Sequence, residues 1–315
     1  DDMITGFDNS TVGVQTLTVH YGEITTTFEI EVVAKSLSGI SIGTKPEKSR
    51  YLKDVDVLDL TGGKLTLHYN NGTSDDNAVA ITADMVSGFN NTTVGTNTLT
   101  VTYREMQTTF DVQICVEDTE SFVGGIGSKE KPYLILTEEH LNNVRYHLDA
   151  NFLLMDDIII TDYAEWQPIG YYGEEFTGYF DGNGYAIRGL NDIAAQYGGL
   201  FECNNGIITS LGIISENISF ASIGGCIAAT NNGVIINCYS NVDSLAGWCI
   251  GGIAGYNNGT ISNCYNSGSL SGSICGGIVA TNNENGSIVN SYNTGNTNVP
   301  MREEMQIGGI AASNG

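Results

Sequence analysis

Basic residues are scarce in this chain. Its 315 residues include 12 lysines and arginines against 36 aspartates and glutamates, a formal net charge of −24. Nucleic acids and anionic membranes are bound through clustered Lys and Arg, so neither is expected as a partner. Between Gly189 and Val299 there is no Lys or Arg at all. We therefore expect that a ligand of this segment is not recognised through charge.

Long apolar runs and metal-binding cysteine motifs are also lacking. No stretch of 18 apolar residues occurs, so the sequence predicts no membrane insertion. The seven cysteines are odd in number and include no Cys-x-x-Cys pair. This argues against a disulfide scaffold and a zinc ribbon, and no cofactor is expected. The chain opens on Asp1-Asp2 without a signal peptide, and we expect it to be a piece of a longer exported protein.

A long internal repeat organises the first third of the chain. The stretch from Asp2 to Val32 matches the stretch from Asp84 to Ile114, with more than half of the positions identical. In both copies apolar residues alternate with polar ones, which predicts strands with one buried face. These residues are Leu17, Val19, Tyr21, Phe28, Ile30 and Val32, then Leu99, Val101, Tyr103, Phe110, Val112 and Ile114. Further strands are expected at 40–42 and 65–68, with a hairpin turn at Asn70-Asn71-Gly72. The unit predicts a small β-sandwich.

The motifs YLKDVDVLDLTGGKLTLHYNNGTS and MVSGFNNTTVGTNTLTVTY resemble bacterial immunoglobulin-like domains of the group 3 type, which occur in tandem on Gram-positive surface proteins. The resemblance implies that residues 1–34 are the C-terminal half of one domain and residues 35–118 a complete second domain. Gly22 in the first copy becomes Arg104 in the second. Both positions fit an exposed hairpin turn.

A second and shorter repeat fills the C-terminal part. Gly-Gly pairs begin at 198, 224, 251, 276 and 308, and Asn-Gly steps begin at 205, 232, 258 and 285. Each unit holds strand fragments too short to be stable alone, but stacked coils would pair them in parallel about 4.8 Å apart. This predicts a right-handed parallel β-helix (solenoid) of about five coils. Ile235 should stack on Ile261 and Ile288, and Ile253 on Ile278.

The corners of this solenoid are expected at the Asn-Gly steps. We expect the backbone there to need a positive φ, which Gly adopts freely and Asn tolerates. Stacked Asn side chains should satisfy the backbone groups that point inward at these corners.

Units such as GGIAGYNNGTISNCY, which starts at Gly251, resemble the GLUG motif. Its family members are surface and secreted bacterial proteins, and some belong to large immunoglobulin-A-cleaving peptidases. Residues 191–315 are expected to form these repeats, which stop short of a cap at Gly315. Residues 119–190 are expected to hold a linker, a capping helix and the first coil. Thr137 suits the helix N-cap, and the apolar face comprises Leu141, Val144 and Leu148. The fold class is therefore all-β with one N-terminal capping helix.

Candidate catalytic groups are few. His140 and His147 both fall on the expected helix, and no His-Glu-x-x-His motif occurs, so peptidase activity is not expected in this chain. The strongest carboxylate group comprises Asp156, Asp157, Asp162 and Asp181. After Lys131 the only basic residues are Arg145, Arg188 and Arg302. A β-elimination site would lack its usual base, whereas a hydrolytic acid pair stays open. The run Asp181-Gly-Asn-Gly is interpreted as a turn rather than a calcium loop.

Two vertical rows of the solenoid could also carry chemistry. Cys238 and Cys264 are interpreted as small apolar fillers rather than a metal or disulfide site. Tyr239, Tyr265 and Tyr292 are expected to form an aromatic ladder, mainly structural, with glycan binding as the alternative. The run Gly124-Gly125-Ile126-Gly127 is interpreted as a loop because no βαβ unit follows it.

These patterns favour a non-catalytic stalk or adhesion module of an extracellular, cell-wall-associated surface protein. Its expected partner is a host glycan or protein, and the chain is expected to be a monomer. Two alternatives remain: a carbohydrate-active β-helix enzyme, and an accessory region of a surface peptidase whose catalytic domain lies elsewhere. No catalytic or metal-binding residue is assigned from the sequence, and the binding residues are unknown.

Overall fold

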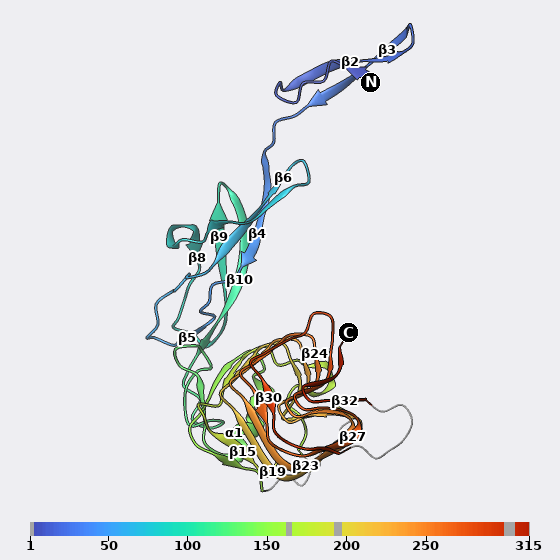
Figure 1. Cartoon of the computed structure of the whole chain (residues 1–315). Coiled ribbons are helices and arrows are strands. Elements are labelled where there is room, and N and C mark those ends of the chain that lie inside the picture. The colour runs from blue at the N-terminus through green and yellow to red at the C-terminus, as the bar shows by residue number, and fades with distance from the viewer. Residues whose placement is uncertain (1–2, 162–165, 192–196, 299–305, 315) are drawn as a thin grey trace. The chain divides into compact units, whose positions relative to one another are not determined.

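The computed structural model describes residues 3–161, 166–191, 197–298 and 306–314 (Figure 1). Two compact units divide the chain. The first contains Asp1–Ser49 and Asp56–Ile114, and the second contains Arg50–Val55 and Cys115–Gly315. The predicted all-β class, with an immunoglobulin-like domain, a parallel β-solenoid of about five turns and one short helix, is confirmed.

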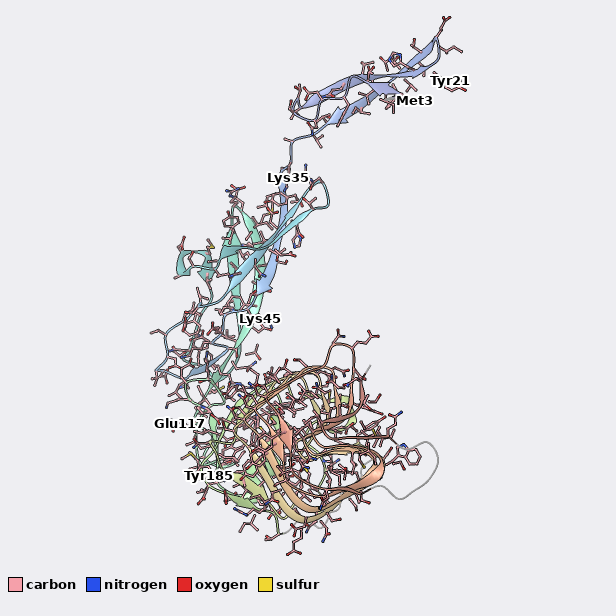
Figure 2. All side chains as sticks on the ribbon, in the orientation of Figure 1. Met3, Tyr21, Lys35, Lys45, Glu117 and Tyr185 are labelled. Carbon is pink, nitrogen blue, oxygen red and sulfur yellow. The ribbon has the colours of Figure 1, made fainter. Side chains whose placement is uncertain are left out.

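The first strands form an antiparallel sheet in the order β1-β2-β3, with β1 at Ile4–Thr5, β2 at Gly13–Tyr21 and β3 at Ile24–Val32. Leu17 lies opposite Phe28 in the register of β2 and β3. Leu17 is only 6% exposed, whereas Phe28 is 43% exposed. Tyr21 lies at the end of β2, where it is 75% exposed (Figure 2). The alternation therefore forms the predicted hairpin, but one of its faces is only partly covered.

The repeat that follows forms two antiparallel sheets. One has the order β4-β6-β7, with β4 at Leu37–Thr44, β6 at Lys64–Tyr69 and β7 at Ser74–Ala80. The other contains β8 at Val86–Ser87, β9 at Gly95–Tyr103 and β10 at Met106–Cys115. A 3-10 turn, η1, covers Ala83–Met85, and β5 covers Arg50–Leu52 in the second unit. Both sheets supply the core: Ile40, Leu65, Leu67, Leu99, Val101, Phe110 and Val112. Each predicted strand of this domain is confirmed.

The hairpin turns of this domain use residues with positive φ. Gly72 has φ +78°, and its N–H donates to the Tyr69 carbonyl at 3.0 Å. In the turn between β9 and β10, Arg104 and Glu105 have φ of +48° and +69°. Gly22 has φ +60° at the equivalent position of the first copy. The turn geometry is therefore retained when Gly is replaced by Arg, at the small cost that a left-handed conformation imposes on a side chain.

Three parallel sheets wrap around the core of the solenoid (Figure 1). The first sheet contains β11 (Tyr133–Ile135), β12 (Asn151–Leu154), β14 (Tyr179–Asp181), β18 (Ile207–Thr209), β22 (Val234–Ile236), β25 (Thr260–Ser262) and β29 (Ser287–Val289). The second contains β17 (Phe201–Asn204), β21 (Ala228–Asn231), β24 (Ala254–Asn257), β28 (Val279–Asn282) and β33 (Ala311–Asn314). Parallel stacking therefore begins at Tyr133.

The third sheet is the widest. Its strands are β13 (Ile158–Ile159), β15 (Ala186–Arg188), β16 (Tyr197–Gly198), β19 (Gly212–Ser219), β20 (Ile223–Gly225), β23 (Tyr239–Gly251), β26 (Tyr265–Asn266), β27 (Leu270–Gly276), β30 (Tyr292–Asn293), β31 (Thr297–Asn298) and β32 (Gln306–Gly308). The long strand β23 pairs with strands of both neighbouring coils, β19 and β20 before it and β26 and β27 after it.

Apolar side chains stack in register along the interior. Ile235 pairs with Ile261, and Ile261 with Ile288, as predicted. Ile253 donates its N–H to the Ile278 carbonyl at 2.9 Å, which confirms the second predicted stack. The first column continues toward the N-terminus through Ile208, Phe180 and Phe152. Burying each such side chain contributes about 1.5–3 kcal/mol.

The predicted capping helix is short. Helix α1 covers Glu138–Asn143, the 3-10 turn η2 covers Val144–Tyr146, and a further turn, η3, covers Tyr171–Gly173. The Thr137 hydroxyl accepts from the His140 N–H at 3.2 Å, so Thr137 is the N-cap as predicted. Leu141 and Val144 are fully buried, and Leu148 packs against the same core. The predicted apolar residues therefore pack into the core, but only Leu141 lies in α1, because Val144 begins η2 and Leu148 follows it.

The expectation of positive φ at the Asn-Gly steps is wrong. Positive φ occurs instead one corner later, at Asn183, Ser210, Asn237, Asn263 and Asn290. Glycine is required at the Asn-Gly steps because the coils approach closely there. A Cβ added to Gly233 would lie 2.1 Å from the Gly206 carbonyl oxygen, and one added to Gly259 would lie 2.1 Å from the Gly233 oxygen.

Asparagine side chains form two hydrogen-bonded columns beside these steps. In the inner column Asn204 donates to Asn231, Asn231 to Asn257 and Asn257 to Asn282, at 2.8, 2.8 and 2.7 Å. Asn204, Asn231 and Asn257 are fully buried. The Asn204 Oδ1 also accepts from the Gly206 N–H at 3.1 Å. The prediction that stacked Asn side chains satisfy inward backbone groups is confirmed.

The outer column runs in the opposite direction. Asn283 donates to Asn258 at 2.6 Å, Asn258 to Asn232 at 2.7 Å, and Asn232 to Asn205 at 2.8 Å. Asn205 in turn donates to the Glu175 carboxylate. Glu175 therefore supplies the acceptor that the first amide of this column needs.

Candidate functional site

The expectation that both histidines fall on the helix is wrong for His147, since α1 contains His140 but His147 is the C-cap of η2. His140 Nδ1 accepts from the Leu136 N–H at 3.3 Å. The ring of His147 packs on Tyr133, with centroids 5.1 Å apart. Both rings flank Phe122, at 6.3 and 5.7 Å. Burial lowers the pKa of both histidines, so near neutral pH both rings are favoured in the uncharged, packed form.

The described aspartates of the predicted carboxylate cluster accept hydrogen bonds from backbone N–H groups. Asp156 accepts from the Asp157 N–H, and Asp181 accepts from the Asn183 N–H, both at 2.8 Å. The second contact belongs to the predicted turn. Asp162 lies outside the described residues. Arg302 does as well, and Arg145 donates to the Asn142 carbonyl at 3.0 Å.

Asp157 is the member of this group that forms an ion pair with a basic residue, Arg188. Its carboxylate accepts from the Ala186 N–H at 2.8 Å and from the Arg188 Nε at 2.9 Å. The Ala186 hydrogen bond, with help from the Arg188 guanidinium, lowers the pKa of Asp157 below its usual value. A depressed pKa suits a permanently ionised positioning group and disfavours a proton donor.

The cysteine row consists of buried thiols. Cys238 Sγ lies 3.3 Å from the Ile236 carbonyl oxygen, and Cys264 Sγ lies 3.2 Å from the Ser262 oxygen. Both thiols are about 1% exposed. Burial raises the pKa of Cys238 well above its ordinary value, which disfavours the reactive thiolate. In this geometry both residues act as core fillers.

The predicted tyrosine ladder is present on the outer face of the third sheet. Tyr239 and Tyr265 have ring centroids 5.2 Å apart and an interplanar angle of 6°, and Tyr265 and Tyr292 are 5.3 Å apart at 7°. A Cβ added to Gly212 would lie 2.3 Å from Tyr239 Cζ, so the Tyr239 ring also covers Gly212. The rings therefore cover one another's faces, and a sugar could stack flat only on the terminal ring, Tyr292.

A depression lies beside this ladder on the same face. Its volume is about 370 Å³, and its lining includes Asn191, Ile214, Glu216, Asn241 and Asp243. Ile214 and Glu216 come from β19, and Asn241 and Asp243 come from β23. These strands pair with Ile214 opposite Asn241 and Ser215 opposite Val242. This register places Glu216 and Asp243 on adjacent coils.

Buried groups below the depression position one of its amides. The Ser215 hydroxyl donates to the Leu190 carbonyl at 2.9 Å and lies 3.3 Å from Asn191 Oδ1. Within the part of the chain that the structure describes, the side chains of Glu216, Asn241 and Asp243 make no hydrogen bond or ion pair. Sequence reasoning did not single out these residues. The available signal was that Glu216 and Asp243 occupy equivalent positions of successive repeats.

The residues that the structure describes lack two further features. Among them, no group of three or more His, Cys, Asp or Glu side chains could hold a metal ion. None of their helices is long and apolar enough to cross a membrane.

Comparisons with known proteins agree with this architecture. Residues 44–114 match the bacterial Ig-like domain (group 3) family, and residues 246–271 match the GLUG motif. A crystal structure from Bacteroides ovatus, provisionally named an immunoglobulin A1 protease, has a TM-score of 0.52 and 26% identity. The match covers 62% of this chain and 65% of that one.

Two curated relatives share shorter regions. A protein of Evansella cellulosilytica, provisionally named a Gly-rich membrane protein, is 38% identical over 134 residues, which are 38% of this chain and 16% of the relative. Pectate lyase L of Thermoclostridium stercorarium is 28% identical over 153 residues, which are 46% of this chain and 12% of the relative. The chain thus spans less than a fifth of either relative. The chain thus combines a region that matches the group 3 bacterial Ig-like family, residues 44–114, with a β-solenoid that contains a match to the GLUG motif at residues 246–271.

Proposed function

We propose that this chain is a non-catalytic, extracellular display module of a bacterial surface protein, in which the solenoid is the binding element. The observation that carries the proposal is the closed hydrogen bonding of the coils. The coils join one another through paired strands, and the four coils from Asn204 to Asn283 are also joined by both asparagine columns. Such stacking gives a rigid element with extended faces, which suits adhesion.

The groups with catalytic potential support the same conclusion. The carboxylates of Asp156, Asp157 and Asp181 accept backbone N–H groups, and the Arg188 guanidinium is held by Asp157. A general acid or base must be free to exchange a proton with substrate. The immunoglobulin-like domain and the GLUG motif also support an extracellular location, because both are typical of surface proteins.

Two experiments test this proposal. Antibodies against the chain should label intact cells of the producing bacterium, and external protease should remove the epitope. Labelling only after lysis would refute the extracellular location. The purified chain should release no product from a polysaccharide panel and should show no change of Tm with EDTA. Turnover that is lost in Asp181→Asn would refute the non-catalytic function.

A second candidate is a carbohydrate-active enzyme, favoured by the likeness to pectate lyase L. One base, Arg188, does lie beside a carboxylate. Unsaturated products from polygalacturonate, absent in Arg188→Ala, would support this candidate. The third, an accessory region of a surface peptidase, is favoured by the likeness to the Bacteroides ovatus structure. It predicts binding to a peptidase substrate without cleavage by this chain.

A further inference from the structure

We propose that the depression on β19 and β23 is a binding site for a neutral oligosaccharide. The proposal rests on the display function and deepens it, because it names the class of ligand that the displayed solenoid would bind. Three observations carry it: the lining of the depression, the sign of its charge, and its continuity with the tyrosine ladder.

The lining offers a dense set of hydrogen-bonding groups over a small apolar floor. Glu216 and Asp243 present acceptor oxygens, and Asn241 presents both a donor and an acceptor. Asn191 contributes a carbonyl oxygen, which lies 3.3 Å from the Ser215 Oγ, and amide N–H groups that can donate. Sugar rings carry hydroxyls that donate and accept at close spacing, and their C–H faces suit an apolar floor. A volume of about 370 Å³ is at the lower end of small-molecule sites.

The charge of the site selects against anions. Glu216 and Asp243 stand on adjacent coils, which are about 4.8 Å apart. The described cation nearest in register is Arg188, which pairs with the residue Ile214. Its guanidinium is bound by Asp157, with Nη2 at 2.9 Å from Oδ2. An acidic sugar would therefore face two carboxylates without a free basic partner, and like charges in one site repel strongly.

The site extends along the strand toward the ladder. Tyr239 precedes Asn241 by two residues in β23, so both side chains stand on the outer face about 6.6 Å apart. One face of the Tyr239 ring is covered by Tyr265, and its hydroxyl edge lies over Gly212, two residues before the lining residue Ile214 in β19. A second sugar ring could therefore meet this edge while the first occupies the depression.

Isothermal titration calorimetry of the intact chain tests the proposal. The probes are cellohexaose, xylohexaose and mannohexaose, with hexagalacturonate and calcium chloride as counter-probes. At least one neutral hexasaccharide should bind, and Asn241→Ala and Asp243→Ala should each weaken its affinity about tenfold, the effect of losing one good hydrogen bond. Asn217→Ala and Ser244→Ala are matched controls, because they are exposed on the same two strands outside the lining. Both controls should bind like the original chain.

Several results would overturn the site. These are no binding of a neutral hexasaccharide, equal weakening by the control variants, binding of hexagalacturonate with similar affinity, or a response to calcium alone. Cleavage of a bound hexasaccharide would leave the site standing and refute the non-catalytic function. Failure to bind, with cell-surface labelling intact, would refute the site and leave the display function standing.

Discussion

Removing one amide from the inner asparagine column should destabilise the solenoid far more than removing its neighbour in the outer column. Asn231 is fully buried and links Asn204 to Asn257, at 2.8 Å on each side. Asn231→Ala leaves the Asn204 Nδ2 and the Asn257 Oδ1 without this partner inside the core. Each orphaned group costs about 1–3 kcal/mol, and Asn204 Nδ2 keeps a long contact with the Val234 carbonyl at 3.4 Å, so we expect a loss of roughly 2–4 kcal/mol.

Asn232→Ala is the matched control. Asn232 also accepts from one asparagine and donates to another, at 2.7 and 2.8 Å, but its side chain is exposed. Water can replace it for both partners, so the expected loss is within about 0.5 kcal/mol. The same residue type, with one accepted and one donated amide hydrogen bond in its column, is thus compared at two levels of burial.

Urea unfolding followed by circular dichroism and tryptophan fluorescence measures both variants. Trp166 is 2% exposed and Trp248 is 61% exposed, so changes in emission will report mainly on Trp166. With a slope of about 3 kcal/mol per molar urea, Asn231→Ala should lower the midpoint by about 1 M. Equal losses in the two variants, or a loss below about 1 kcal/mol for Asn231→Ala, would refute the reasoning.

Asn231→Asp adds a pH test of the same column. Burial and the Asn257 Oδ1 would both disfavour the charged carboxylate, so its pKa should be raised above the unfolded value of about 3.9. Stability should then be highest below that value, where a protonated Asp can donate to Asn257. It should fall as the pH rises from about 4 toward the folded pKa. A pH-independent difference from the original chain would contradict this expectation.

Three further predictions follow from other contacts. Gly233→Ala should cost about 1–3 kcal/mol in the free energy of unfolding, because the added Cβ would lie 2.1 Å from the Gly206 carbonyl oxygen; an unchanged urea midpoint would contradict the steric argument. Asp157→Asn should cost less than about 1 kcal/mol at pH 7, since the ion pair with Arg188 is partly exposed. Because the folded pKa of Asp157 is lowered, this difference is present above the unfolded value of about 3.9 and should shrink as pH falls through the folded value; a difference that grows in acid would refute it. Denatured, unreduced protein should show close to seven thiols by Ellman titration, and three or fewer would indicate disulfides.

The sequence predicted those parts of the fold that repeat. Ile235, Ile261 and Ile288 recur at the same place in each unit, and one coil of constant length must bring them into register. The rungs at Tyr133–Ile135 and Asn151–Leu154 lack the Gly-Gly and Asn-Gly marks, so the first repeats were not visible. Large aromatic side chains fill the core in these coils, in place of the small and aliphatic residues that mark the later repeats.

The glycine corners and the candidate site show where sequence reasoning stops. Gly233 and Gly259 were assigned to positive φ, but contact with the preceding coil is what requires them. Close contact with a neighbouring coil and a positive φ both select glycine, so the sequence alone does not distinguish the two causes. Likewise Glu216 and Asp243 are ordinary exposed acids until the register places them on adjacent coils.

The opposed directions of the two asparagine columns bear on how such a chain can change its length. Within the columns, each interior coil gives one amide hydrogen and takes one in each column, as Asn231 and Asn232 do. Duplication of a whole coil therefore leaves the number of unpaired amides unchanged, whereas insertion of part of a coil breaks both columns at once. The side-chain amide dipoles of the two opposed columns nearly cancel. Lengthening both columns therefore adds little to the electric field along the solenoid axis. Gene duplication could thus vary the reach of this module in steps of one coil, with no new chemistry needed at its ends.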